Sequence, residues 1–182
     1  MMRVLPTDLP GVLLVEPDVL RDARGYFLET FHQRRYREAG IPYSFVQDNQ
    51  SRSVRGTLRG MHAQAKKPQG KLIRVLQGEI FDVAVDIRPG SPTFGKWTGA
   101  NLSAETFRQM LIPPGFAHGF CVLSESADVA YSCTDFYDRA DEIGFRWDDP
   151  AVAIAWPIGR PLLSAKDAAL PTLAELRQRL SA

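Results

Sequence analysis

The chain has 182 residues, which is enough for one domain with a full hydrophobic core and short for two. Hydrophobic residues make up 45% and charged residues 24%, the balance of a folded globular protein rather than a disordered or membrane one. The 22 lysines and arginines nearly cancel the 21 aspartates and glutamates, so no overall field favours nucleic acid polymers or anionic membranes as partners. We therefore expect a single domain over residues 1–182.

The N-terminal residues and the cysteines bear on the cellular compartment. No apolar run near the N-terminus is long enough for a secretion signal or a membrane span, and Pro6 and Pro10 interrupt this segment. The two cysteines, Cys121 and Cys133, lie in apolar segments and match neither a metal knuckle nor a disulfide framework. We expect two buried thiols and a cytoplasmic location.

From about residue 12 to residue 134 the chain consists of short apolar runs separated by glycine, proline and small polar residues. Such runs are typical of β-strands. The expected strands are 12–15, 26–31, 57–64, 72–76, 80–86, 97–102, 109–112, 116–123 and 129–134. Strand following strand predicts an all-β sandwich or barrel.

Helical periodicity occurs at two places. One is 33–39, and the other is 172–180, where Leu173, Leu176 and Leu180 recur on one face. Thr172 and Glu175 fit a capping box, so we expect a C-terminal helix over about 172–181. The proline-rich segment 148–161 predicts irregular chain against the strands.

Two segments carry the functional signal. The first, 56–64, contains His62 and is followed by Gly70, Lys71 and Gly78, and the second is the hexapeptide Pro-Pro-Gly-Phe-Ala-His that ends at His118. They resemble the two motifs of the cupin superfamily. The resemblance implies an all-β fold, a double-stranded β-helix (jelly roll, cupin) barrel with short peripheral helices.

The metal ligands of the cupin pattern are incomplete in this chain. Gln64 stands where the pattern has its second histidine, and Lys71 stands where it has glutamate. A catalytic metal needs three or more nitrogen or oxygen ligands, and only His62 and His118 remain. We therefore expect no metal and no other cofactor. The Lys71 ammonium is instead suited to stabilising a developing oxyanion.

A histidine base beside a cation suits one type of reaction. Removal of a proton next to a carbonyl leaves the electron pair on the carbonyl oxygen as an enolate, which a cation stabilises. Return of a proton on the opposite face then inverts the carbon. His62 is the candidate base and Tyr131 the candidate acid, with Tyr137 as a nearby alternative.

Several ordered blocks between about residues 10 and 167 resemble the dTDP-4-dehydrorhamnose 3,5-epimerase family. These blocks are 24–29, 45–49, 58–62, 69–72, 81–86, 91–95, 112–120 and 163–167. The resemblance implies a homodimeric isomerase in which strands from both subunits contribute to each site. It also implies inversion of C3 and C5 of dTDP-4-dehydro-6-deoxy-D-glucose to give dTDP-4-dehydro-L-rhamnose, in deoxysugar (rhamnose) biosynthesis.

The resemblance gives the matching residues their roles. It makes His62 the proton acceptor, oriented by Asp167, and it makes Lys71 the enolate stabiliser and Tyr131 the proton donor. The positions that match substrate contacts are Arg24, Glu29, Gln47, Asp48, Asn49, Arg59, Lys71, His118, Glu142 and Lys166.

Two residues depart from the family pattern. Ala63 stands where members commonly have tyrosine, and Gln50 stands where they have histidine. Strand alternation points Ala63 away from His62, so we expect its effect on packing rather than on chemistry. The same alternation separates Arg59 from His62, and both residues reach one site only if Gly60 marks a bulge.

Other interpretations remain open at the level of sequence. His118 after Pro-Pro-Gly equally suits the ordering of a turn, whereas Lys66 and Lys67 are expected to be solvated surface lysines. The alternative functions are an epimerase acting at C3 or C5 alone on a related nucleotide keto sugar, a non-catalytic sugar-nucleotide-binding cupin, and a metal-dependent cupin enzyme.

Overall fold

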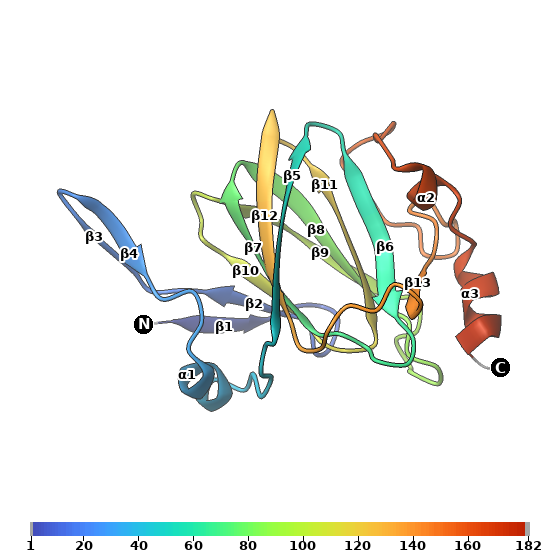
Figure 1. Cartoon of the computed structure of the whole chain (residues 1–182), viewed down its shortest axis with the longest axis horizontal. Coiled ribbons are helices and arrows are strands. Elements are labelled where there is room, and N and C mark those ends of the chain that lie inside the picture. The colour runs from blue at the N-terminus through green and yellow to red at the C-terminus, as the bar shows by residue number, and fades with distance from the viewer. Residues whose placement is uncertain (1, 181–182) are drawn as a thin grey trace.

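The computed structural model describes residues 2–180, and over these residues the strands form a six-stranded sheet, a five-stranded sheet and a two-stranded hairpin. The first sheet has the order β1 (Arg3–Pro6), β2 (Leu13–Glu16), β10 (Gln109–Ile112), β7 (Lys71–Gln77), β12 (Ser126–Cys133) and β5 (Gln47–Val54). The second has the order β13 (Glu142–Gly144), β6 (Leu58–Gln64), β11 (Phe116–Val122), β8 (Glu79–Asp86) and β9 (Trp97–Ser103). The paired strands run antiparallel, and the two sheets face each other as a jelly-roll barrel, which confirms the expected fold class (Figure 1).

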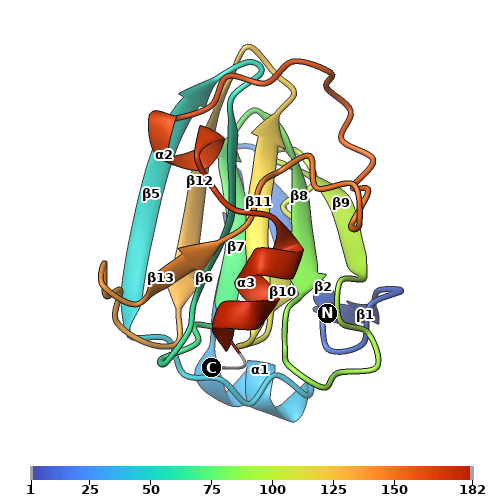
Figure 2. The same cartoon turned by 90° about the vertical axis from the view of Figure 1, so that its right-hand side faces the viewer.

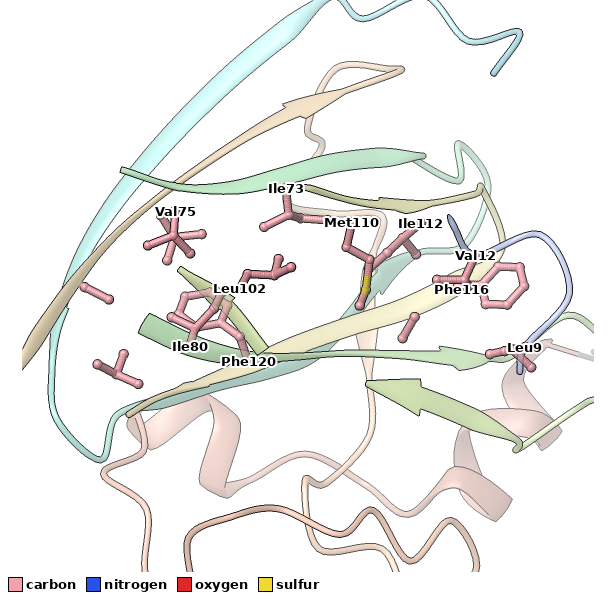
Figure 3. Close-up of a cluster of buried hydrophobic side chains, with 14 residues drawn as sticks. Leu9, Val12, Ile73, Val75, Ile80, Leu102, Met110, Ile112, Phe116 and Phe120 are labelled. Carbon is pink, nitrogen blue, oxygen red and sulfur yellow. The ribbon is translucent and has the colours of Figure 1, made fainter. Parts of the chain in front are cut away.

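The main hydrophobic core lies between the two sheets. Successive residues of a strand point to opposite faces, so alternate apolar residues of both sheets meet in the middle. Figure 3 shows this cluster between two layers of strands, with Ile73 and Val75 from β7 on one side and Ile80 and Phe120 from β8 and β11 on the other. Each such buried side chain contributes roughly 1.5–3 kcal/mol.

The C-terminal helix α3 (Leu173–Leu180) covers the outer face of the five-stranded sheet (Figure 2). Leu173 and Leu176 are buried there in a second cluster that includes Met61 of β6. The expected capping box is confirmed, because the backbone N–H of Thr172 donates to Glu175 Oε2 at 2.7 Å and the N–H of Glu175 donates back to Thr172 Oγ1 at 3.3 Å. The expected last helical position, 181, lies outside the described residues.

Two further helices hold segments against the barrel. Helix α1 (Gln33–Glu38), close to the expected 33–39, buries Tyr36 in a third cluster with Leu72 and Leu111 on the outer face of the six-stranded sheet. The short helix α2 (Ala165–Ala168) was not expected from the sequence. Its N-cap residue Ser164 accepts a hydrogen bond from the backbone N–H of Asp167 at 3.0 Å.

The hairpin of β3 (Val19–Asp22) and β4 (Gly25–Leu28) projects away from the barrel (Figure 1). It leaves large apolar side chains exposed, with Leu20 61% and Phe27 68% accessible. Strand β4 begins one residue before the expected strand 26–31 and ends three residues before it. Within residues 2–180, no helix has the length and apolar character needed to cross a membrane.

The sequence did not predict strands β1, β3, β5 and β13. Strand β5 reads Gln-Asp-Asn-Gln-Ser-Arg-Ser-Val, so it lacks the alternation of apolar and polar residues that indicates a strand. The structure gives the reason, since its inner face lines a polar cavity and its outer face is exposed. The remaining three strands have only three or four residues each within the described chain. Cys121 and Cys133 are free and buried, as expected.

Candidate active site

Polar side chains line two adjoining cavities of the barrel, of about 450 and about 260 Å³. Both cavities are lined by His62, Lys71 and Tyr131. His62 comes from β6 of the five-stranded sheet, whereas Lys71 and Tyr131 come from β7 and β12 of the facing sheet. The candidate base therefore lies on one wall of the site, and the candidate acid and cation lie on the other.

His62 is held by a carboxylate distant in sequence. Its Nε2 lies 2.6 Å from Oδ1 of Asp167, which the short helix α2 presents and whose side chain is only 5% accessible. Burial alone would raise the pKa of Asp167, but the hydrogen bond and charge of His62 lower it. A carboxylate only accepts hydrogen bonds, so Nε2 carries the proton and Nδ1 keeps a lone pair. Nδ1 is therefore the nitrogen that is free to accept a substrate proton.

The expected bulge in β6 is confirmed. His62 pairs with His118 of β11 but Arg59 pairs with Phe120, so β6 has one residue more than β11 over this stretch. Gly60 has φ of +124°, and a Cβ there would lie 2.6 Å from Cα of Gly119. The bulge places Arg59 and His62 on the same cavity, where the Arg59 Nε donates to Ser53 Oγ at 3.0 Å.

Lys71 and Tyr131 lie close together on neighbouring strands. The Lys71 Nζ is 5.9 Å from the centre of the Tyr131 ring. Burial lowers the pKa of Lys71 and raises the pKa of Tyr131. A weakly solvated ammonium interacts strongly with a developing oxyanion, and a protonated phenol beside it can donate its proton to the enolate carbon. Lys66 and Lys67 are exposed, as expected.

Glu142 organises the mouth of the site. Its Oε1 lies 2.5 Å from the Nζ of Lys166 and 4.0 Å from the Nδ1 of His62, and its Oε2 accepts a hydrogen bond from the Tyr137 hydroxyl at 2.6 Å. That bond to Glu142, followed by desolvation, raises the pKa of Tyr137 to about 12. Because this hydroxyl is committed to Glu142 at an exposed position, the geometry favours Tyr131 as the proton donor.

A family model described as dTDP-4-dehydrorhamnose 3,5-epimerase matches residues 6–175 of the chain. The chain belongs to the dTDP-4-dehydrorhamnose 3,5-epimerase family. It is thus an isomerase, as the sequence led us to expect.

Individual relatives agree with this assignment. A dTDP-4-dehydrorhamnose 3,5-epimerase of Pseudomonas aeruginosa is 55% identical over 168 residues, which cover 91% of this chain and 93% of that protein. The crystal structure of a Legionella pneumophila dTDP-6-deoxy-D-glucose-3,5-epimerase in complex with dTDP-4-keto-L-rhamnose has a TM-score of 0.95 and 51% identity, and the match covers 99% of this chain and 97% of that one. A dTDP-4-dehydrorhamnose 3-epimerase of Streptomyces niveus is 42% identical over 178 residues, covering 97% of this chain and 86% of that protein.

Most site residues expected of this epimerase family member lie at the two cavities. They are His62, Lys71, Tyr131, Asp167, Gln47, Asn49, Arg59, His118, Glu142 and Lys166. Ala63 packs in the cluster on the outer face of its sheet, and it also borders the smaller cavity.

Three expected contact residues are not brought to the site by this chain. Asp48 lies on the outer face of β5, next to Gln50, where it accepts a hydrogen bond from Ser132 and borders a third cavity of about 630 Å³ that Gln47, Asn49 and Tyr131 also line. Strand alternation explains this position, because it turns the neighbouring Asn49 inward and Asp48 outward. Arg24 pairs with Asp22 in the hairpin β3–β4, and Glu29, which follows β4, pairs with Arg35. Figure 1 shows this hairpin away from strand β6, which carries His62.

Asp82 and Ser51 are among the polar residues of the site that the sequence interpretation missed. Asp82 is fully buried, and its Oδ1 lies 2.7 Å from Nε2 of His118. Ser51 lines the larger cavity, and its buried Oγ has no hydrogen-bond partner within residues 2–180. An acid inside an apolar strand such as 80–86 is itself a signal, because a buried charge requires a partner. No comparable signal marks Ser51 in the uniformly polar β5.

The described residues contain no group of three His, Cys, Asp or Glu side chains arranged to hold a metal ion. The absence of a metal and of any other cofactor stays a prediction.

Proposed function

We propose that the chain inverts C3 and C5 of dTDP-4-dehydro-6-deoxy-D-glucose to give dTDP-4-dehydro-L-rhamnose in deoxysugar (rhamnose) biosynthesis. One observation carries the proposal: His62 and Tyr131 come from facing sheets and line one site together with Lys71. A base and an acid on opposite walls, beside a cation, match the requirements of inversion next to a ketone. The Legionella relative bound to dTDP-4-keto-L-rhamnose supports the choice of substrate.

The chemistry follows from the roles that the geometry allows. His62 Nδ1 takes the proton from the carbon next to the C4 ketone, and the C–H electron pair forms the enolate, whose oxygen Lys71 stabilises. The Tyr131 hydroxyl then gives a proton to the opposite face of the carbon, leaving a phenolate. Asp167 supports the imidazolium formed on His62. Proton exchange with solvent restores both groups, and C3 and C5 both qualify because each adjoins the ketone.

The remaining polar residues suit the two ends of the substrate. Arg59 and Lys166 line the larger cavity and match the charge of a pyrophosphate. The amides of Gln47 and Asn49 line the smaller cavity and suit the nucleotide base or the sugar hydroxyls. The proposal uses no metal and no other cofactor.

A homodimer is also part of the proposal. The hairpin β3–β4 carries Arg24 away from its own barrel and exposes Leu20 and Phe27. Exposed apolar surface of this kind suits burial against a second copy, which would bring Arg24 and Glu29 to the partner's site. We place the enzyme in the cytoplasm, where free thiols such as those of Cys121 and Cys133 persist.

Deuterium incorporation tests the function. Purified protein treated with EDTA is incubated with dTDP-4-dehydro-6-deoxy-D-glucose in deuterated water, and the sugar nucleotide is analysed by mass spectrometry. Two deuterons per molecule, absent with His62→Ala, support the double epimerase. One deuteron identifies the single-position alternative, which is the activity named for the 42% identical Streptomyces niveus 3-epimerase. Binding without exchange leaves a sugar-nucleotide-binding cupin and overturns the proposal.

A further inference from the structure

A second histidine–aspartate pair lies beside the first. His118 of β11 and Asp82 of β8 both point into the barrel, where His118 lines the larger cavity. The Nε2 of His118 is 2.7 Å from Oδ1 of Asp82, and both side chains are nearly inaccessible, at 7% and 0%. The other carboxylate oxygen, Oδ2, has no hydrogen-bond partner within residues 2–180. The pair therefore differs from a surface ion pair, because among the described residues only His118 makes a hydrogen bond with the Asp82 side chain.

The chemistry of the carboxylate decides the tautomer of His118. A carboxylate accepts hydrogen bonds and donates none, so the Nε2 of His118 must carry the proton. Burial lowers the pKa of His118 more than the charge and hydrogen bond of Asp82 raise it, which favours a neutral ring. A neutral ring protonated at Nε2 has a lone pair at Nδ1. Within the described chain, no group donates a hydrogen bond to this Nδ1.

The other polar groups around His118 show what this lone pair can bind. Arg59, Lys71 and Lys166 line the same cavity and are donors only. A phosphate or a ketone oxygen is an acceptor and suits those cations, but it has no hydrogen to offer Nδ1. A sugar hydroxyl has one. His118 Nδ1 thus suits a hydroxyl of the ligand, whereas its cationic neighbours suit a phosphate or a ketone oxygen.

We propose that Asp82 is a positioning residue that fixes the tautomer of His118, so that His118 Nδ1 accepts a hydrogen bond from a hydroxyl of the bound sugar. The inference rests on the proposed function for the identity of the sugar.

Nitrogen NMR tests the tautomer without turnover. The chain has 3 histidines, so ¹⁵N-histidine labelling gives a spectrum that single substitutions assign. We expect His118 to show a protonated Nε2 and an unprotonated Nδ1, and we expect the Nδ1 signal to move when dTDP-quinovose, which has hydroxyls but no ketone, is added. The nucleotide dTDP alone, which lacks the sugar, should leave it in place. A protonated Nδ1, or a signal that dTDP-quinovose does not move, overturns the inference.

Kinetics test whether Asp82 acts through His118. In Asp82→Asn the asparagine NH₂ can donate a hydrogen bond to Nε2 of His118, so the proton of the ring is no longer fixed on Nε2. The substitution should lower kcat/KM about tenfold, which is the effect of leaving one buried hydrogen bond unmade. In a His118→Phe background the same substitution should have no further effect. Effects that multiply in the double variant would show that Asp82 acts elsewhere. His118→Asn, which places an acceptor near the position of Nδ1, should retain more activity than His118→Phe.

A matched control separates positioning from folding. Asp86→Asn removes another buried carboxylate of β8, but one that binds Arg88 rather than a site residue. It should lower the melting temperature and leave kcat/KM unchanged. If the wild-type protein shows no deuterium exchange at all, the proposed function fails, while the NMR result on His118 still decides the tautomer.

Discussion

Substitution of Lys71 by methionine should separate catalysis from folding. Lys71 sits among inward-facing residues, and burial lowers the pKa of its ammonium because the site solvates the charge poorly. Methionine has a similar length and no charge, so the variant should be as stable as the wild type or more stable. The same change removes the cation that faces the enolate. Loss of one oxyanion stabiliser lowers kcat by about 10²–10³, equivalent to about 3–4 kcal/mol.

The assay follows the rate of deuterium incorporation by mass spectrometry and the melting temperature by calorimetry. The stability gain should be present at neutral pH and should shrink as the pH rises through the lowered pKa of Lys71 toward its ordinary value, because the wild type then loses the buried charge. Lys67→Met, at an exposed position of the neighbouring loop, is the matched control and should change neither quantity. Exchange within threefold of the wild-type rate in Lys71→Met, or a loss of activity accompanied by unfolding, would refute this reasoning.

Three further substitutions test the supporting structure. Gly60→Ala places a Cβ 2.6 Å from the backbone of β11 at a residue with φ of +124°, so it should cost about 1–3 kcal/mol in thermal unfolding and abolish exchange. The Asp86 carboxylate accepts hydrogen bonds from an arginine and two hydroxyls, and these lower its pKa more than burial raises it. Asp86→Asn should therefore cost about 2–4 kcal/mol in urea unfolding at pH 7. That difference should shrink as the pH falls below about 4, the ordinary aspartate pKa. Tyr137→Phe should slow inversion less than about tenfold, because the Tyr137 hydroxyl is committed to Glu142, and a larger loss would revive Tyr137 as the proton donor.

The fold could be predicted wherever a strand buries one face in an apolar core. The runs 80–86 and 109–112 alternate or stay apolar because their residues pack into the hydrophobic clusters, and both are strands in the structure. Strand β5 could not be predicted in this way, because its inner face lines a polar cavity. Helix α2 has only four residues, which is too short for the apolar periodicity that indicates a helix.

The residues of the candidate site also differ in whether local sequence could predict them. His62 and Lys71 were found from local motifs, and the bulge at Gly60 followed from the need to place Arg59 beside His62. The contact between His62 and Asp167 spans 105 residues and was implied only by the family resemblance. Local spacing does not report such contacts, since they depend on how the C-terminal segment crosses the barrel.

The residues that lie outside the two cavities or were omitted have physical reasons of their own. Asp48 alternates with Asn49 along β5 and therefore faces the other side of its sheet. Asp82 had been treated as part of an apolar strand, although its charge required the partner that His118 provides.

The central claim is that His62 and Tyr131 act on the sugar from opposite walls of the site. NMR of the sugar after reaction in deuterated water tests it most directly, because NMR gives the deuterium label and the configuration of C3 and C5 separately. The account predicts that the wild type inverts both carbons and labels each with one deuteron. With Tyr131→Phe, it predicts labelled carbons of unchanged configuration, because His62 still removes and returns the proton on its own face. Inversion at the wild-type rate without Tyr131, or labelling that survives the loss of His62, would contradict it.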